Sequence, residues 1–311
     1  MTRQILPRLV CAGSVVVDVV LHVPQLPDPG GDMVARGSML AVGGAFNVMS
    51  AARAQGLTVT YAGGHGVGPF GDMVRSVLAQ AGIDVAAPAA PNLDTGFTVT
   101  FVAEDGERTF VTAPGAEARL TVESLNASMI SEEDFVYVSG YGLAYPDSGP
   151  ALADWVSRLA TGITVVADPG PLVGEIPKAI LQDVASRSTW WTCNEREARL
   201  MTGGASRDES IRAVAKIAGR KGVLVRIGRD GCLLLMRDGE VQHLPGQFVR
   251  TVNTTGAGDI HTGTFMAALA AGLEPPEAVR RANLAASIVV SRQGPPTAPT
   301  LAGNQSCDGP P

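Results

Sequence analysis

Short apolar runs rich in β-branched residues alternate along the chain with longer segments whose apolar residues recur at helical spacing. Runs such as 58–62 and 135–139 have the length and composition of buried strands, whereas 45–56 and 275–291 have the spacing of helices. Strands that alternate with helices are typical of a mostly parallel sheet covered by helices on both faces, so the pattern predicts a three-layer α/β/α fold. Further strands are expected at 163–167, 189–193 and 223–227, further helices at 72–81, 148–160, 195–201, 208–219 and 258–271, and a hairpin through Asp238 and Gly239.

Two stretches of the chain interrupt this alternation. Residues 9–23 read as a buried strand that continues into a second strand, and after a turn rich in proline and glycine residues 33–42 return as a strand. The pair Asp105-Gly106 between strands at 97–103 and 107–112 is a hairpin signal. We expect the two excursions, at about 14–42 and 95–113, to pair as a small separate β-sheet. We expect this small sheet and the rest of the 311 residues to form a single domain, apart from a loose tail at 302–311.

The composition excludes several classes of partner. The 45 % hydrophobic content of 311 residues is enough for a large buried core. A net charge of −6 without any Lys/Arg-rich run argues against nucleic acid and against an anionic membrane surface as partners. The N-terminus lacks the pattern of a secretory signal, and the apolar runs end well before the roughly 20 residues that span a bilayer. We therefore expect a cytoplasmic protein.

Cysteines and histidines are scattered along the chain rather than grouped. The four cysteines have no Cys-x-x-Cys spacing, and the four histidines have no spacing typical of a transition-metal site. A dedicated metal cage is therefore not expected, and most of the cysteines are expected to be small core residues. The residues concerned are Cys11, Cys193, Cys232, Cys307, His22, His65, His243 and His261.

The stretch 251–263 carries the clearest chemistry. Gly256, Ala257 and Gly258 lie just before Asp259, where a helical pattern begins. Glycines let the backbone approach an anion closely, and the first N–H groups of a helix have no partner within the helix, so this segment is a candidate phosphate cradle. A carboxylate there would repel phosphate, which favours Asp259 as a base that takes a proton from a hydroxyl attacking the phosphate. The alternative is a glycine-rich turn in which Asp259 only caps the helix.

The segment 253–259, Asn-Thr-Thr-Gly-Ala-Gly-Asp, resembles the Asp-Thr-Thr-Gly-Ala-Gly-Asp signature of the ribokinase family of carbohydrate kinases, also called the phosphofructokinase-B (PfkB) family. Three further matches follow the family's order. Residues 43–47, Gly-Gly-Ala-Phe-Asn, resemble its Gly-Gly-x-x-x-Asn signature with one residue fewer before the Asn. Residues 194–197 resemble its Asn-x-x-Glu motif, and 228–231 resemble its nucleotide-side Gly-x-x-Gly turn. Four matches in order across nearly the whole chain are far more specific than any one of them.

The resemblance implies a ribokinase-like three-layer fold in which the small β-sheet is a lid. It also implies a kinase that uses ATP and Mg²⁺ to phosphorylate a hydroxyl of a sugar or sugar-like molecule, and that could form a homodimer through the lid. Asp259 would be the base, and the amides of Gly256, Ala257 and Gly258 would form the anion hole. Glu197 would hold Mg²⁺ through water. Substrate would be bound by Asp18, Gly43, Gly44 and Asn47, and the nucleotide by Asn194, Glu197, Gly228, Gly231, Thr255 and Asn283.

Each of these residues also has an ordinary structural interpretation. Asp18 could be an edge residue facing water, Asn47 an ordinary helix residue, and Glu197 a solvated surface charge. Arg108, in the second excursion, would reach an acidic or hydroxyl-rich substrate if the lid folds over the site, and would otherwise be an exposed hairpin arginine. Only the ordered set of motifs favours the functional interpretation.

Four residues depart from the family pattern. Met49 and Thr264 are bulkier than the residues usual at their positions, so we expect the helix packing there to be slightly rearranged, and Asn253 and His261 bear on the site itself. Asn253 stands where many members have an aspartate that helps to hold a monovalent cation beside the anion hole. Because an amide binds a cation less strongly than a carboxylate does, we expect cation binding to be weaker here, which leaves potassium activation an open question. His261 replaces a usual aromatic residue and lies off the helical face of Asp259. We expect it to have a packing or supporting role, with substrate contact as the alternative.

The sequence leaves the substrate open. Ribokinase has a glutamate after its middle strand, but the segment 138–141, Val-Ser-Gly-Tyr, has no acid, so ribose is not the default substrate. A nucleoside kinase of the same family is the alternative, with stacking by Phe46, Phe97, Phe110 or Tyr141. The alternative outside enzymes is a kinase-like protein that only binds its ligand as a sensor, and Asp259 argues against it because a pure binder needs no base.

A competing nucleotide motif lies at 66–71, where Gly-Val-Gly-Pro-Phe-Gly matches the G-x-G-x-x-G pattern of dinucleotide-binding proteins. Pro69 lies inside the pattern, and no acidic residue ends a second strand about 20 residues later. We therefore interpret this loop as a strand-to-helix connection in which Asp72 caps the following helix. A Walker A sequence is absent, which sets P-loop kinases aside.

Overall fold

The computed structural model describes residues 7–301, except 106, 205, 238, 293, 295 and 297. Its largest element is a nine-stranded sheet with the order β13-β12-β11-β10-β9-β8-β1-β4-β5. All neighbours from β11 to β5 pair in parallel, and β12 is antiparallel to both of its neighbours, β11 and β13. The strands are β1 (Arg8–Ala12), β4 (Thr58–Tyr61), β5 (Asp84–Val85), β8 (Phe135–Ser139), β9 (Thr164–Asp168), β10 (Trp190–Asn194), β11 (Gly222–Arg226), β12 (Cys232–Met236) and β13 (Val241–Leu244).

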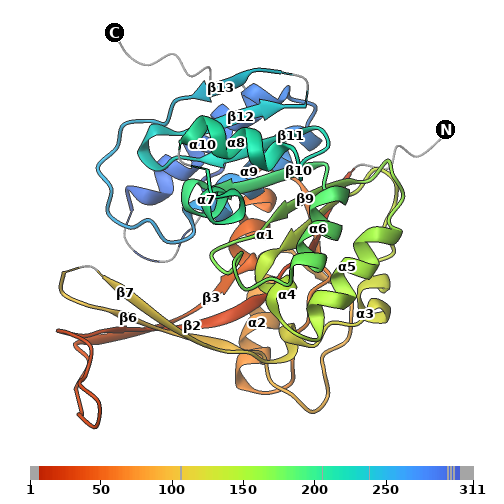
Figure 1. The fold of residues 1–311 in the computed structure, drawn as a ribbon. Helices are drawn as coiled ribbons and strands as arrows, with labels where there is room; N and C mark the ends of the chain where they lie inside the picture. Colours follow the sequence, from red (N-terminus) through yellow and green to blue (C-terminus); the bar gives the residue numbers. More distant parts are fainter. Residues whose placement is uncertain are drawn as a thin grey trace.

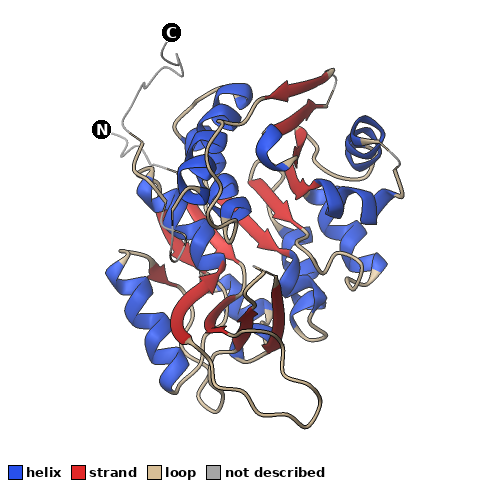
Figure 2. Cartoon of the chain, turned by 90° about the vertical axis from the view of Figure 1, so that its left-hand side faces the viewer, coloured by secondary structure: helices blue, strands red, loops and turns tan. Residues whose placement is uncertain are grey.

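Helices cover both faces of this sheet, as Figure 2 shows. Two large apolar clusters lie between the sheet and the two helical layers, and alternate residues of β1 contribute to opposite clusters: Leu9 and Cys11 to one, Val10 and Ala12 to the other. The predicted three-layer α/β/α fold is therefore confirmed. One layer contains α1 (Ala45–Ala54), α2 (Pro69–Gln80), α9 (Ala257–Ala270) and α10 (Pro275–Val290). The other contains α3 (Val122–Asn126), α4 (Gly140–Ala144), α5 (Ser148–Arg158), α6 (Lys178–Arg187), α7 (Glu195–Thr202) and α8 (Arg207–Ala215).

A second sheet of four strands projects from this body (Figure 1). We call it the small sheet; its order is β3 (Gly37–Gly44), β2 (Val15–His22), β6 (Phe97–Val102) and β7 (Arg108–Ala113). β2 pairs antiparallel with β3 and parallel with β6, and β6 pairs antiparallel with β7. The two excursions that interrupt the helix–strand alternation therefore do pair with each other, as expected.

The helices α1 and α9 pack closely, which fixes the two motifs that they carry relative to each other. Gly263 of α9 faces the backbone of α1, and a Cβ atom at this position would overlap the carbonyl oxygen of Val48. The absent side chain lets the helices approach. The N-terminal ends of α1 and α9 consequently lie side by side, with Asn47 next to Asp259.

The connection after β4 differs from its prediction. Helix α2 begins at Pro69 rather than at Asp72, and the interpretation of Asp72 as its cap is wrong. The carboxylate of Asp94 instead accepts hydrogen bonds from the backbone N–H groups of Phe70 and Gly71. Proline is favoured in the first turn because it has no N–H to satisfy there. The start of α2, where a dinucleotide would place its phosphates, is thus occupied by the protein's own carboxylate.

Most other expected elements are present within a few residues of their predicted bounds. The short strand β5 and the helices α3, α4 and α6 were not expected. The hairpin after β11 is confirmed by the antiparallel pairing of β12 with β13, although Asp238 itself lies outside the described residues. Gly106, Cys307 and the tail 302–311 also lie outside them. Cys11, Cys193 and Cys232 are fully buried, free cysteines, as expected of core residues.

Candidate active site

The candidate site lies where several parallel strands end. Asp168, Asn194 and Arg226 are the last residues of β9, β10 and β11, three neighbouring strands of the large sheet. Arg226 donates a hydrogen bond to Thr262 of α9, which brings the start of that helix to the same edge. Ligands of open α/β sheets bind at this carboxyl edge. The topology therefore gathers motifs that are far apart in the sequence.

The glycine-rich segment that is the candidate phosphate cradle forms the turn into α9. Helix α9 begins at Ala257, and Gly256 precedes it in the left-handed conformation, with φ of 72°. A Cβ atom on Gly256 would lie 2.6 Å from Cγ of Pro296, and one on Gly258 would lie 3.3 Å from Nε of Arg226. Glycine is therefore required at 256 both by backbone conformation and by space. The amides at this helix start have no partner within the helix and can bind an anion.

Asp259 lies in the first turn of α9, where its carboxylate accepts a hydrogen bond from Nδ2 of Asn47, at 3.1 Å. Burial raises the pKa of this carboxyl from 3.8 to about 7; the bond from Asn47 opposes the rise, and the nearby Asp168 adds to it. A carboxyl with a pKa near neutrality can accept a proton and release it again at neutral pH. The side chain thus has the property that a general base needs.

Asp18 and the glycines of the first motif meet on the small sheet. Asp18 of β2 lies against Gly43 of β3, where a Cβ atom would overlap the aspartate's Oδ2. Gly44, with φ of 62°, forms the sharp turn from β3 into α1. Burial raises the pKa of Asp18 from 3.8 to about 6. Asp18 therefore does not face bulk water as a simple edge residue would, and it lies next to the motif that carries Asn47.

The Asn-x-x-Glu motif forms the N-terminus of α7. Nδ2 and the backbone N–H of Asn194 both donate to the carboxylate of Glu197, at 2.7 Å each, and the backbone N–H of Glu197 donates to Oδ1 of Asn194 at 2.9 Å. This is a capping box, which fixes both side chains at the end of β10. Glu197 is only 3 % exposed, so it is not the solvated surface charge that the sequence left open. Burial, and after it the proximity of Asp168, raises its pKa.

Arg226 connects these parts, although the sequence did not single it out. Its Nη1 lies 2.9 Å from Oδ2 of Asp168 and donates to the hydroxyls of Thr192 and Thr262, at 2.6 and 3.1 Å. Its Nη2 lies 3.7 Å from Oε2 of Glu197. Burial alone would lower the pKa of Arg226, but the two carboxylates more than offset this and raise it, so the guanidinium stays charged beside the cradle.

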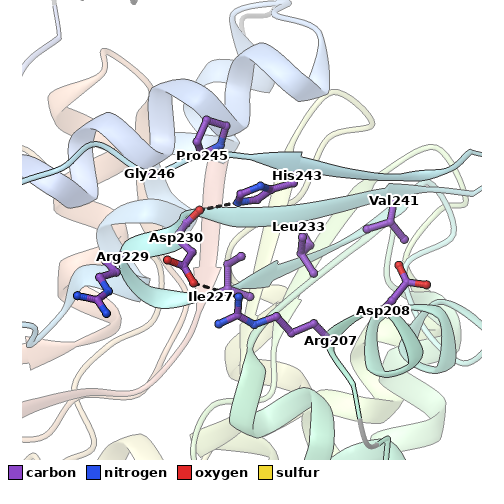
Figure 3. Close-up of a pocket in the computed structure, with 10 residues that line it drawn as sticks. All are labelled: Arg207, Asp208, Ile227, Arg229, Asp230, Leu233, Val241, His243, Pro245 and Gly246. Atoms are coloured by element: carbon purple, nitrogen blue, oxygen red, sulfur yellow. Dashed lines mark hydrogen bonds and ion pairs between the residues drawn. The ribbon is translucent and has the colours of Figure 1, made fainter.

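The Gly-x-x-Gly turn follows β11 directly and forms one side of a surface cavity. Gly228–Asp230 is a single 3-10 turn, and Gly231, with φ of 100°, packs against the backbone of Leu244. The cavity has a volume of about 490 Å³, and Figure 3 shows it between this turn, the strands β12 and β13, and the start of α8. Arg207 and His243 at its rim both bond to Asp230. The cavity contains none of the cradle residues.

Asn283 and His261 form a buried pair behind the cradle. Nε2 of His261 and Oδ1 of Asn283 lie 3.1 Å apart, and Nδ2 of Asn283 donates to the carbonyl oxygens of Leu244 and Pro245. Burial, together with the nearby Arg226, lowers the pKa of His261 to about 3, so the imidazole is neutral. Asn283 thus ties α10 to the loop after β13. This arrangement agrees with a packing role for His261.

One hydrogen bond joins the tip of the small sheet to the cradle. Nη2 of Arg108, at the start of β7, donates to Oδ1 of Asn253 at 2.9 Å. The same oxygen accepts the backbone N–H of Thr255 at 2.9 Å, and Nδ2 of Asn253 donates to the carbonyl oxygen of Gly294 at 3.1 Å. Arg108 is therefore not a free hairpin arginine: it reaches the segment that leads into the anion hole.

Within the part of the chain that the structure describes, no group of three or more His, Cys, Asp or Glu side chains is arranged to hold a metal ion by itself. Asp168 and Glu197 nevertheless offer carboxylate oxygens close together, which suits a Mg²⁺ ion that keeps most of its water. None of the described helices is long and apolar enough to cross a membrane.

Sequence reasoning missed Asp168 and Arg226. A usable signal was present for both, because each lies within one residue of the end of a predicted strand (163–167 or 223–227) and is followed within two residues by glycine. Polar residues at the carboxyl ends of parallel strands face the ligand-binding edge. What the sequence could not show is that β9, β10 and β11 are neighbours in the sheet, which is the reason that Arg226 reaches both acids.

Comparisons with known proteins agree with this geometry. The sequence matches the family described as pfkB family carbohydrate kinase over residues 6–301. An uncharacterized sugar kinase of Escherichia coli K12, YegV, is 31 % identical over 303 residues, which cover 96 % of this chain and 92 % of that protein. The solved ribokinase of Thermotoga maritima has a TM-score of 0.79 at 26 % identity and covers 93 % of this chain and 94 % of its own. The structure of Arabidopsis thaliana ribokinase complexed with ribose and ATP also has a TM-score of 0.79, at 24 % identity, and covers 95 % of this chain and 96 % of its own.

Proposed function

We propose a function on the premise that this chain belongs to the pfkB family of carbohydrate kinases: it transfers the γ-phosphoryl group of ATP to a hydroxyl of a sugar or sugar-like molecule. The observation that carries the proposal is the position of Asp259. Its carboxyl has a pKa of about 7, lies beside the glycine cradle and accepts a hydrogen bond from the first motif. Few other roles require a carboxylate at an anion-binding helix start.

In the proposed reaction, Asp259 takes the proton of the substrate hydroxyl as that oxygen attacks the γ-phosphorus. The bond between phosphorus and the bridging oxygen breaks, and the charge that builds up on the phosphoryl oxygens is stabilised by the amides of Gly256, Ala257 and Gly258. Asn47 orients the carboxylate of Asp259, and Asp18 binds a further substrate hydroxyl. Arg226 adds a fixed positive charge next to Gly258.

The nucleotide side is proposed to lie between the Gly-x-x-Gly turn, Thr255 and the loop that Asn283 holds. Asn194 and Glu197, fixed by their capping box, would position a Mg²⁺ ion through its water molecules. That ion would neutralise charge on the nucleotide phosphates. The binding of ATP by the similar Arabidopsis thaliana ribokinase supports this assignment.

The small sheet is proposed to act as the lid of the site. The pairing register places Asp18, Thr98, Phe110 and Arg108 on the same face, because they occupy directly paired or alternate positions of β2, β6 and β7. The bond from Arg108 to Asn253 turns this face toward the cradle. Closure over the substrate would exclude water and so limit hydrolysis of ATP. Dimerisation through this sheet stays a prediction.

A nucleoside substrate is the second candidate, and the position of Phe110 favours it. This residue is 59 % exposed on the face of the small sheet that carries Asp18, so its ring is available for stacking. Phe97 is not available, because its ring packs against Phe70 with centroids 5.3 Å apart. The substrate panel must therefore include nucleosides as well as sugars.

The decisive experiment measures ATP consumption over pentoses, hexoses, keto-acid sugars and nucleosides, and repeats it with the Asp259→Asn variant. We expect turnover to fall by a factor of about 10² to 10⁴ while ligand binding, measured by calorimetry, is largely retained. Asp183→Asn, a surface aspartate on α6, is the matched control and should leave turnover unchanged. Unchanged turnover in Asp259→Asn would refute the mechanism. Binding without turnover in the wild-type protein would favour the sensor hypothesis.

A further inference from the structure

The surroundings of Asn253 do not fit a monovalent cation. Such a cation needs several oxygen atoms with free lone pairs, and an amide or backbone carbonyl oxygen has two. Both lone pairs of Oδ1 of Asn253 are used, by Nη2 of Arg108 and the N–H of Thr255. The carbonyl oxygen of Val290 likewise accepts two bonds, from the N–H groups of Val252 and Asn253, at 2.7 and 3.1 Å.

Two further features oppose cation binding at this place. Nδ2 of Asn253 donates to the carbonyl oxygen of Gly294, so an amide N–H points where a carboxylate would offer an oxygen. The guanidinium of Arg108, 2.9 Å from Oδ1 of Asn253, would repel a second cation. Among the described ion pairs, none involves Arg108, so its charge is not neutralised by a neighbouring carboxylate.

These contacts link the small sheet to the anion hole. Arg108 holds Oδ1 of Asn253, and the same oxygen holds the backbone N–H of Thr255, the residue before Gly256. The path therefore runs from β7 through the side chains of Arg108 and Asn253 to the turn that begins α9. Arg108 and Asn253 are 145 positions apart in the sequence. In this arrangement the turn is held by Arg108 and Asn253, without a carboxylate or a metal cation.

We infer that Arg108 takes the place of the monovalent cation beside the anion hole. It is a positioning residue: from the closed small sheet it supplies the positive charge and orders the segment 253–256. The inference rests on the proposed function, since it concerns the same phosphoryl transfer. Two consequences follow. Transfer by this chain is independent of potassium, and the anion hole is complete only when the small sheet lies over the site.

The first test measures phosphoryl transfer by the full-length wild-type protein, with potassium or tetramethylammonium chloride at constant ionic strength. We expect rates that agree within about twofold. The second test compares Arg108→Met with Arg108→Lys. We expect Arg108→Met to lower kcat by about 10- to 100-fold, because a small displacement of a positioning segment is enough for such a loss, with little change in KM for ATP. Arg108→Lys keeps the charge and should retain most of the rate.

Arg36→Met is the matched control, because Arg36 pairs with Glu104 and makes no described contact with the cradle. It should match the wild type. A third measurement requires no turnover: hydrogen exchange of the backbone amides at 253–258, which Arg108→Met should accelerate and Arg36→Met should not.

The double variant Arg108→Met/Asn253→Asp restores a carboxylate at position 253 and removes the competing guanidinium. It should therefore gain activation by potassium.

Several outcomes would overturn the inference while leaving the proposed function intact. These are activation of the wild type by potassium, or an Arg108→Met variant that matches Arg36→Met in both kcat and hydrogen exchange. A wild-type protein that turns over no member of the substrate panel would instead overturn the proposed function. Because exchange is measured without substrate, the two failures are distinguishable.

Discussion

Replacing Asp259 by asparagine should stabilise the fold above neutral pH while it removes activity. The carboxyl has a pKa of about 7 in the folded protein against 3.8 for an unperturbed group, chiefly because burial disfavours its charged form. The fold therefore carries an energetic penalty whenever Asp259 is ionised. Asparagine keeps the shape and can accept the same hydrogen bond from Asn47, but it has no charge to bury.

The size of the effect follows from the pKa difference. Each pKa unit corresponds to about 1.4 kcal/mol, so ionising Asp259 in the folded state costs up to about 4 kcal/mol. Because the side chain stays partly exposed, we expect about 2 to 4 kcal/mol. The folded pKa is raised, so the wild type loses stability as the pH rises from about 4 to 7 and loses no more above pH 7. The gain of Asp259→Asn should therefore grow over that interval and then stay constant.

The assay is urea-induced unfolding of both proteins at pH 5, 6, 7 and 8, with the free energy of unfolding compared at each pH. Asp18 and Glu197, whose pKa values are also raised, are present in both proteins, so their contributions largely cancel. Asp183→Asn on the surface of α6 should show no such dependence. A variant that is no more stable than the wild type at pH 8, or equally stabilised at pH 5 and pH 8, would refute the reasoning.

Three further predictions follow from the site and its supports. The kcat/KM of the wild type should fall as the pH decreases through about 7, because protonated Asp259 cannot accept a proton; a flat profile from pH 5.5 to 8 would exclude it as the base. Arg226→Met should lower the free energy of unfolding by about 3 to 5 kcal/mol, since it leaves Asp168 without its buried partner, whereas Arg212→Met, which breaks an exposed pair with Asp208, should lower it by at most about 1 kcal/mol. Similar losses in urea unfolding would contradict the buried network. Gly263→Val should lower stability by about 1 to 3 kcal/mol, because its side chain overlaps the α1 backbone at Val48, while Gly162→Ala has open space around it and should be nearly neutral in thermal unfolding.

The layers of the fold could be predicted from the sequence because each strand and helix has its own local pattern. The alternation of buried runs with helical spacing recurs throughout the chain, and the two excursions were recognised because they break it. The helix start at 256–259 was also readable, since glycines, an acid and an apolar helical pattern occur in a fixed order. Such local features require no knowledge of neighbouring elements.

The start of α2 shows where local patterns fail. Asp72 is a good capping residue by type, but the helix already begins at Pro69 because Asp94, 22 positions beyond Asp72, satisfies the amides of Phe70 and Gly71. When a residue far along the chain caps a helix, the sequence of the helix itself does not show where it begins. The short helices α3 and α4 were not predicted, because each has only five residues, too few to show a helical period.

The motif residues of the candidate site could be named from the sequence, but the positions of the two arginines around them could not be predicted. Asp18, Asn47, Glu197 and Asp259 could be named from sequence patterns, and the structure brings Asn47 to Asp259 and Glu197 toward Asp168. Arg226 could not be placed, because its role depends on the order of β9, β10 and β11 in the sheet. The contact between Arg108 and Asn253 depends on the position of the small sheet relative to the large sheet and its helices. No local sequence pattern predicts that position.

Arg226 and Arg108 both supply positive charge to the proposed site, but they depend on different parts of the fold. The carboxyl groups of Asp168, Glu197 and Asp259 lie around the proposed phosphate cradle, and when all three are ionised they outnumber the single charge of Arg226. Arg226 is held by buried partners and is present whatever the small sheet does, whereas Arg108 arrives only with β7. On the inference drawn above for Arg108, an open site lacks one of the charges that transfer requires. A protein organised in this way would delay phosphoryl transfer until closure has excluded water, since the same movement completes the anion hole and shields it.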